Sequence, residues 1–355
     1  MKKIPMFIFL YLITLSLSAY EIRQYSKTFV DPARNNRSIP TTIFYPFDVN
    51  NPTAEYPYIV YGHGYTGSYT DYPVLTNAIV NLGWIIAYPT TEGGYIVSTS
   101  NFALDLAFLK NAIYNLSISD STAAIYNKVD TLAIVGGYSM GGACAVAAAT
   151  FEPSFASLVT LAAAPITWLN LYPAAITMAA NVTMPSITYS GFVDNIAPQD
   201  ENQIPIYNNL ASIYKSFVSF TNQGHPSFYD NPLIYVILEP WLQFIKTNSG
   251  YYLDEFESVL ASYPASTLTY QIVDNLIIIP SIPDNVSIIV DNGSLIISWD
   301  IVLDAHSYKV FASNNPYTGF TDVTNQGFFT TGSRISWNTT LTGAEQRYFY
   351  IKSFR

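Results

Sequence analysis

The stretch "AIVGGYSMGGACAV", residues 133–146, constrains the fold more than any other part of this sequence. An apolar run leads into Gly137-Tyr138-Ser139-Met140-Gly141, and small helix-favouring residues follow. Where a G-x-S-x-G segment joins a strand to a helix, the chain turns within about one residue, so the serine takes strained backbone angles and its hydroxyl is exposed at the turn. This context predicts that Ser139 is a nucleophile. The alternative is a glycine-rich turn whose serine only caps the helix.

The chain up to about Thr247 predicts an α/β fold. From Tyr20 onward, short apolar runs alternate with amphipathic segments, which is typical of a mainly parallel sheet with helices on both faces. With a serine at a strand-to-helix turn, the pattern predicts the α/β-hydrolase fold. Strands are expected near residues 41–45, 58–61, 84–88, 132–135, 158–162, 186–189 and 217–220. Helices are expected near residues 72–81, 102–115, 142–150, 203–212 and 233–246.

The sequence changes character after this catalytic domain, which we place at residues 20–248. Residues 249–279 mix polar, aromatic and proline positions and are expected to form a linker or a last decoration of the domain. From 280 to 355, short alternating strands are separated by turns. This segment resembles a fibronectin type III module, a small all-β sandwich in which Trp299 and Tyr308 would be core aromatics. We expect it to bind a surface or a partner rather than to catalyse.

Residues 1–19 are predicted to be a secretory signal peptide. Lys2 and Lys3 precede an apolar run from Ile4 to Leu17, and small residues suited to signal peptidase lie at its end. The run is short for a bilayer span, which needs about 20 apolar residues. We therefore expect a secreted, periplasmic or cell-surface protein with no integral membrane segment once the signal is removed. A retained N-terminal anchor is the alternative.

Composition narrows the partners and cofactors. The formal net charge is −10, from 15 Lys and Arg against 25 Asp and Glu, which argues against nucleic acid or an anionic membrane as a partner. The one cysteine, Cys144, cannot form an intrachain disulfide and is expected to be a small buried packing residue. No cluster of His, Asp and Glu has the spacing of metal ligands, so neither a metal nor another cofactor is expected.

A serine hydroxyl becomes a nucleophile when a base takes its proton, so Ser139 needs a histidine and a carboxylate that orients it. The chain has three histidines. His306 belongs to the C-terminal segment, and His63 ends an early strand ahead of the nucleophile. His225 follows an apolar strand, where the order serine, acid, histidine requires the base. We predict that His225 is the base and that His63 shapes a loop through hydrogen bonds to backbone.

The predicted acid is Asp194, in the stretch "PSITYSGFVDNIAP". It lies just after a strand, in a short loop that can hold a side chain rigidly. Asp200 and Glu201 are rivals in a context typical of a helix start, and Asp230 is a rival that follows the histidine and so breaks the order. A further alternative is that Asp194 and Asn195 only form a turn.

The tetrahedral intermediate of acyl transfer carries negative charge on oxygen, which backbone N–H groups commonly hold. One such N–H is expected from Met140, the residue after the nucleophile. The other is expected from Tyr65 in "YGHGYTGSYTDY", a loop whose glycines let the backbone approach a substrate closely. The ring of Tyr65 would then form one wall of the acyl pocket.

With these residues in place, the sequence resembles α/β-hydrolases of the polyester hydrolase and cutinase-like group, which includes poly(ethylene terephthalate) hydrolases and has dienelactone hydrolases as wider relatives. The resemblance covers roughly residues 36–247 and is carried by "YNKVDTLAIVGGYSMGG", "FEPSFASLVTLAAAP", "PSITYSGFVDNIAPQ" and "GHPSF". It implies the same triad and the same two amides. It also implies substrate contacts from an aromatic before the nucleophile, here Tyr138, and from a tryptophan after the next strand, where this chain has Ile166. Trp168, two residues on, is expected to substitute.

We therefore predict a secreted, cutinase-like serine esterase that hydrolyses carboxylic esters through an acyl-enzyme, with polyesters such as poly(ethylene terephthalate) among its candidate substrates. No long lid insertion interrupts the loops, which favours bulky or polymeric esters. Within the enzyme class, the alternatives are a general short-chain carboxylesterase, a lipase, a polysaccharide deacetylase-type esterase, and a peptidase or acyltransferase. An alternative of another class is an adhesion protein whose hydrolase domain is inactive.

Overall fold

The computed structural model divides into two compact units, Met1–Asn231 and Pro232–Arg355. The predicted signal peptide, Ile166 and Trp168 lie outside the part of the chain that it describes. The described residues are 20–165, 171–172, 174–276, 283–291, 293–302, 304–324, 327–340 and 348–354.

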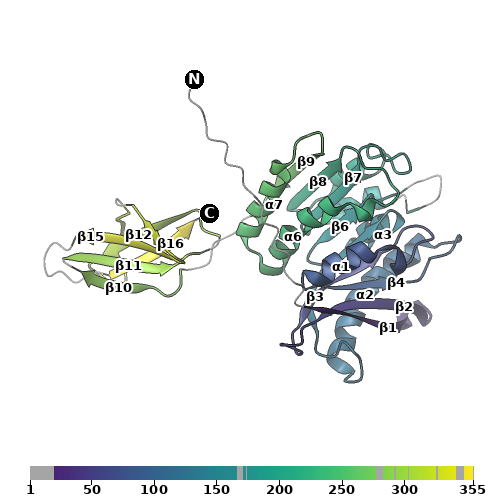
Figure 1. Cartoon of the computed structure of the whole chain (residues 1–355), viewed down its shortest axis with the longest axis horizontal. Coiled ribbons are helices and arrows are strands. Elements are labelled where there is room, and N and C mark those ends of the chain that lie inside the picture. The colour runs from purple at the N-terminus through teal and green to yellow at the C-terminus, as the bar shows by residue number, and fades with distance from the viewer. Residues whose placement is uncertain are drawn as a thin grey trace. The chain divides into compact units, whose positions relative to one another are not determined.

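The sheet of the first unit is mixed and mainly parallel. Its strands are β1 (Glu21–Asp31), β2 (Arg37–Phe47), β3 (Tyr56–Gly62), β4 (Ile85–Pro89), β5 (Val129–Tyr138), β6 (Leu158–Leu161), β7 (Ser186–Gly191) and β8 (Tyr214–Phe220). They lie in the order β1-β2-β4-β3-β5-β6-β7-β8 (Figure 1). β1 pairs antiparallel with β2, and β2 with β4, whereas each later pair in this order is parallel. Because parallel strands end at the same edge of a sheet, the loops after β3, β5, β7 and β8 meet there.

Helices cover this sheet. They are α1 (Pro73–Asn81), α2 (Thr99–Ser119), α3 (Met140–Phe151), α4 (Ala175–Met178) and α5 (Gln203–Asn209). α3 begins directly after Ser139, and its residues from Met140 to Ala149 are all buried. A helix that is apolar on every side is a core helix, and its alanines and glycines allow neighbouring elements to pack closely. The predicted α/β-hydrolase fold class is confirmed.

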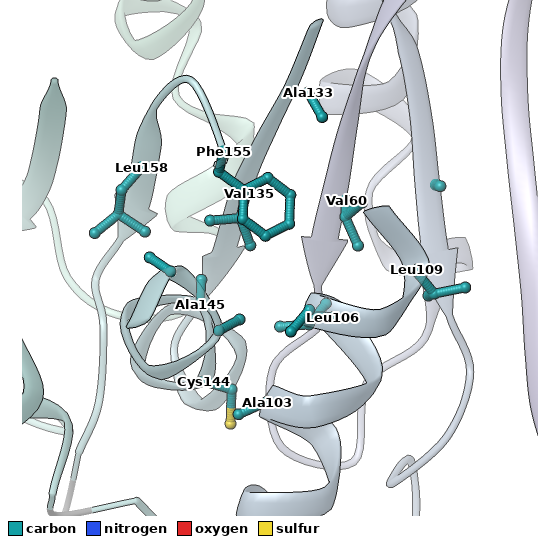
Figure 2. Packing of buried hydrophobic residues seen from close by; sticks show 14 of the residues in the cluster. Val60, Ala103, Leu106, Leu109, Ala133, Val135, Cys144, Ala145, Phe155 and Leu158 are labelled. Atoms are coloured by element: carbon teal, nitrogen blue, oxygen red, sulfur yellow. The ribbon is translucent and has the colours of Figure 1, made fainter. Parts of the chain in front are cut away.

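The core around α3 is shown in Figure 2. Ala103 and Leu106 of α2 lie beside Cys144 and Ala145 of α3, next to Val135 of β5. Complete burial of a leucine such as Leu106 stabilises a fold by about 1.5–3 kcal/mol. These contacts anchor the helix that starts at the serine. Cys144 is free and buried, as expected of a packing residue.

The strands and helices expected from the sequence all overlap observed elements, whereas β1 was not expected. β1 pairs with β2 from Glu21 to Asp31, but most of its side chains are exposed or half-buried. An edge strand with polar residues on its outer positions has no apolar run to reveal it. The short helix α4 is also absent from the prediction.

The second unit begins with α6 (Pro232–Thr247), α7 (Gly250–Ser262) and β9 (Leu268–Asp274). In α6 and α7 the rings of Trp241 and Phe256 lie 5.2 Å apart. Regular structure therefore occupies much of residues 249–279, which were expected to be a linker or a decoration. The proposed domain boundaries stay a prediction.

The remaining strands of the second unit form two antiparallel sheets, β10-β11-β15-β14 and β13-β12-β16. The strands are β10 (Ser287–Asp291), β11 (Ser294–Asp300), β12 (Ser307–Ser313), β13 (Thr321–Asp322), β14 (Phe329–Thr331), β15 (Arg334–Thr340) and β16 (Tyr348–Phe354). Trp299, Tyr308 and Trp337 are buried in their common core. Two antiparallel sheets around one core are consistent with the expected small β-sandwich. The likeness to a fibronectin type III module stays a prediction.

Among the helices in the described part of the chain, none is both long and apolar enough to span a bilayer.

Candidate active site

Ser139 stands at the turn between β5 and α3 with φ 56° and ψ −121°. A non-glycine residue with positive φ is strained, so the surrounding backbone must hold it there. The Ser139 N–H donates to the carbonyl oxygen of Leu161 at 2.9 Å, and the Ser139 carbonyl accepts from Ala164 at 3.0 Å and Ala143 at 3.1 Å. These bonds from β6, the loop after it and α3 fix the turn that presents the hydroxyl.

Close backbone contact explains the glycines beside Ser139. A Cβ atom on Gly141 would lie 2.1 Å from the carbonyl oxygen of Gly62, and one on Gly137 would lie 2.4 Å from the carbonyl of Gly141. Neither distance is compatible with a side chain, because real Cβ atoms do not approach backbone below 3.0 Å. The spacing G-x-S-x-G therefore follows from the packing of β3 and α3 around the turn.

The structure brings Ser139, His225 and Asp194 together from three separate loops. His225 Nε2 lies 2.8 Å from Ser139 Oγ, and His225 Nδ1 lies 2.6 Å from Asp194 Oδ2. All three residues are buried, with 7 %, 5 % and 4 % of their surface exposed. A proton on Nδ1 would bond the carboxylate and leave the Nε2 lone pair facing the serine hydroxyl.

The carboxylate of Asp194 is oriented by its own loop. Its Oδ1 accepts the backbone N–H groups of Ile196 at 2.9 Å and Ala197 at 2.8 Å, which leaves Oδ2 for His225. The turn expected from the Asp-Asn pair therefore exists, and it orients the carboxylate rather than excluding it from the site. The rival acids Asp200, Glu201 and Asp230 are exposed to solvent.

The loop after β3 lies against the nucleophile. A Cβ on Gly64 would be 3.6 Å from the Cβ of Ser139 and 3.0 Å from the ring of Tyr138. Tyr65 follows, partly exposed, and its hydroxyl donates to the carbonyl of Tyr95 at 2.8 Å. Met140 is the first residue of α3, where a helix leaves its N–H groups without intrahelical acceptors. The two predicted donors thus belong to segments next to Ser139, and their role stays a prediction.

His63 bonds to backbone. Its ring is fully buried, with Nδ1 2.8 Å from the carbonyl oxygen of Gly64 and Nε2 2.9 Å from that of Thr91. The ring also packs on Phe102 at 4.7 Å. The hydrogen bonds are those expected of a loop-shaping residue. His306 lies in the second unit with an exposed side chain.

Tyr138 has contacts that the sequence did not suggest. It was predicted to contact the substrate, yet it is 8 % exposed and its hydroxyl donates to the backbone carbonyl of His225 at 2.7 Å. Its ring lies 5.1 Å from the His225 imidazole and 5.0 Å from the ring of Tyr229. Burial raises the pKa of the Tyr138 phenol, so the hydroxyl stays a donor through the neutral range. Substrate contact by Tyr65, Tyr138, Ile166 and Trp168 stays a prediction.

No group of three or more His, Cys, Asp or Glu side chains able to hold a metal ion occurs within the described ranges.

The mainly parallel sheet, its helices and the serine at the turn between β5 and α3 define an α/β-hydrolase fold. A family model described as PET hydrolase-like matches residues 35–248. The chain therefore belongs to the PET hydrolase-like family.

This chain is also similar to cutinases from Thermobifida. It is 27% identical over 191 residues to cutinase est1 of Thermobifida alba, a match that covers 52% of this chain and 57% of that protein. It is 27% identical over 187 residues to cutinase 1 of Thermobifida cellulosilytica, covering 52% of this chain and 64% of that protein. A cutinase of Thermobifida fusca is also 27% identical, over 56% of its length. The match thus spans less than two thirds of each of these relatives.

Proposed function

We propose that this protein is a serine hydrolase of carboxylic esters, cutinase-like and secreted. The observation that carries the proposal is the buried hydrogen-bonded series from Ser139 through His225 to Asp194, at 2.8 Å and 2.6 Å. A strained serine at a strand-to-helix turn, a histidine that contacts it and an oriented carboxylate are the parts that acyl transfer needs. Membership of the PET hydrolase-like family supports the same reaction class.

In the proposed mechanism, Ser139 Oγ attacks the ester carbonyl carbon while His225 Nε2 takes the hydroxyl proton. The new negative charge on the carbonyl oxygen is held by the N–H groups of Met140 and Tyr65. His225 then gives the proton to the leaving alkoxide, and the alcohol departs. Water repeats the sequence on the acyl-enzyme and releases the acid. Asp194 holds the imidazole in the required tautomer and stabilises its cation.

Exposed apolar side chains near the site support a bulky apolar ester as substrate. Phe192, Val193 and Ile196 flank Asp194 and are 62 %, 54 % and 43 % exposed. The Tyr65 hydroxyl donates to the carbonyl of Tyr95. Tyr95 and the next residue, Ile96, are 86 % and 97 % exposed. Large apolar side chains exposed beside polar site residues are typical of a binding surface. We propose that polyesters such as poly(ethylene terephthalate) are among the substrates.

The test is turnover of p-nitrophenyl esters from acetate to long acyl chains, with a polyester film assayed in parallel and Ser139→Ala as control. We expect short-chain turnover that depends on Ser139, together with soluble aromatic product from the film. Short-chain turnover without film release would leave a general carboxylesterase, and a preference for long chains would indicate a lipase. Turnover of no ester at all by the wild type would support the binding-protein alternative.

A further inference from the structure

Three tyrosines, Tyr72, Tyr138 and Tyr229, meet beside the candidate active site and are called the tyrosine cluster below. Tyr72 precedes α1, Tyr138 ends β5, and Tyr229 lies in the turn after His225. The ring centroids of Tyr72 and Tyr229 are 4.6 Å apart, those of Tyr138 and Tyr229 are 5.0 Å apart, and those of Tyr72 and Tyr138 are 6.2 Å apart. Such edge-to-face contacts make the cluster one packed unit.

The hydroxyl of Tyr72 holds the loop after β3. It accepts the backbone N–H of Gly64 at 2.8 Å, and Tyr72 is 1 % exposed. The carbonyl oxygen of Gly64 accepts the N–H of Gly67 at 2.9 Å and lies 2.8 Å from His63 Nδ1. In a planar trans peptide the C=O and the following N–H point in opposite directions. The contacts at the Gly64 carbonyl therefore set the direction of the Tyr65 N–H, the proposed oxyanion donor, and the Tyr72 hydroxyl holds the peptide before it through the Gly64 N–H.

The hydroxyl of Tyr138 restrains the loop that carries His225, but as a donor rather than an acceptor. It donates to the His225 carbonyl at 2.7 Å, while the Tyr138 ring packs against the imidazole at an angle of 36°. The same carbonyl also accepts the backbone N–H of Phe228, at the longer distance of 3.3 Å. The hydrogen bond from the Tyr138 hydroxyl is thus the shorter of these two bonds to the His225 carbonyl.

We propose that Tyr72 and Tyr138 are positioning residues. Their hydroxyls fix the loop after β3, which carries Tyr65, and the loop that carries His225 to one tyrosine cluster, so that both loops keep their alignment to Ser139. The inference rests on the proposed esterase function and deepens it. A displacement of about 1 Å in a reacting group can lower a rate by about a hundredfold, so loops without helical or strand pairing need such restraints. Burial raises the pKa of the Tyr72 and Tyr138 phenols, so both hydroxyls keep their protons at neutral pH.

The experiment compares Tyr72→Phe and Tyr138→Phe with Tyr58→Phe as a matched control. Tyr58 is also a buried tyrosine, and its hydroxyl donates to the backbone carbonyl of Lys110 at 2.6 Å. All three variants lose one buried hydroxyl bond, so we expect similar small decreases in Tm. We expect kcat to fall about tenfold or more for Tyr72→Phe and Tyr138→Phe, with KM within about twofold, because the lost alignment matters in the transition state. For Tyr58→Phe, kcat should stay within about twofold of wild type.

Wild type and Ser139→Ala are measured first, on p-nitrophenyl butyrate at 15 °C, with the folded fraction of each variant taken from circular dichroism. Turnover that depends on Ser139 while either tyrosine variant keeps the wild-type kcat would overturn the inference and leave the proposed function standing. A kcat that falls equally in Tyr58→Phe would also overturn it, since the loss would then follow stability alone. Absence of turnover dependent on Ser139 would overturn the proposed function and the inference together.

Discussion

The hydroxyl of Tyr138 donates a hydrogen bond of 2.7 Å to the backbone carbonyl of His225. The residue before the candidate nucleophile therefore restrains the histidine that contacts that nucleophile, whose Nε2 lies 2.8 Å from Ser139 Oγ. Tyr138 and Ser139, which make these two contacts, are adjacent residues at the turn between β5 and α3. Any shift of that turn moves the serine and the histidine together, which preserves their separation.

Replacement of Asp194 by Asn tests the assignment of the acid. Asn keeps the size of the side chain but cannot stabilise an imidazolium, and its amide group favours the wrong tautomer of His225. We expect kcat for p-nitrophenyl butyrate to fall by about a thousandfold or more, with little change in Tm. Asp200→Asn is the control, because Asp200 is exposed six residues further along the same loop. Equal activity of the two variants would contradict the assignment.

The close approach of Gly62 and Gly141 predicts a large effect of one added methyl group. In Gly141→Ala the new Cβ would lie 2.1 Å from a backbone oxygen that cannot rotate away. We expect a loss of about 2 kcal/mol or more in the free energy of unfolding, measured by urea denaturation. Gly94→Ala serves as the control, since no atom lies within 4 Å of a Cβ at that position. A variant at Gly141 as stable as that at Gly94 would refute the packing argument.

Buried phenols predict a loss of stability in alkali. Burial raises the pKa of Tyr58, Tyr72, Tyr138 and Tyr189, whereas in the unfolded chain these groups release their protons near pH 10. Above about pH 10 the unfolded state therefore binds fewer protons than the folded state, so the free energy of unfolding falls as pH rises. We expect the urea midpoint to fall steeply between about pH 9.5 and 11. A constant midpoint over that interval would count against burial of these phenols.

Tyr189 offers a sharper form of the alkaline test. Its hydroxyl is buried and has no hydrogen-bond partner among the described residues. Removal of an unpaired buried hydroxyl costs little, so Tyr189→Phe should be as stable as wild type, or more stable, at pH 7. Because the variant lacks one of the shifted phenols, its urea midpoint should fall less between about pH 9.5 and 11. A variant that is clearly less stable at pH 7 would show that the hydroxyl has a partner.

Much of the fold and the positions of Ser139, Asp194 and His225 could be predicted because strong local rules apply to them. The glycine spacing follows from steric contact around one turn, and the scarcity of histidine left few candidates for the base. The strand β1 escaped prediction because pairing with β2, rather than an apolar run, makes it a strand.

The contacts of the tyrosine cluster could not be predicted from the sequence. The chain has 29 tyrosines, and although Tyr138 precedes the predicted nucleophile, nothing local shows which backbone group its hydroxyl or that of Tyr72 reaches. Their partners Gly64 and His225 are 8 and 87 residues away along the chain. Only the folded arrangement of the loops decides which hydroxyl reaches which backbone group.

The central claim is that Ser139 is the nucleophile of an ester hydrolase, and labelling with a fluorophosphonate tests it most directly. We expect one label per molecule, found by mass spectrometry on the peptide that contains Ser139, with esterase activity lost in proportion to labelling. The Ser139→Ala variant should neither take up the label nor turn over ester. A label on another residue, or full activity after complete labelling, would contradict the account.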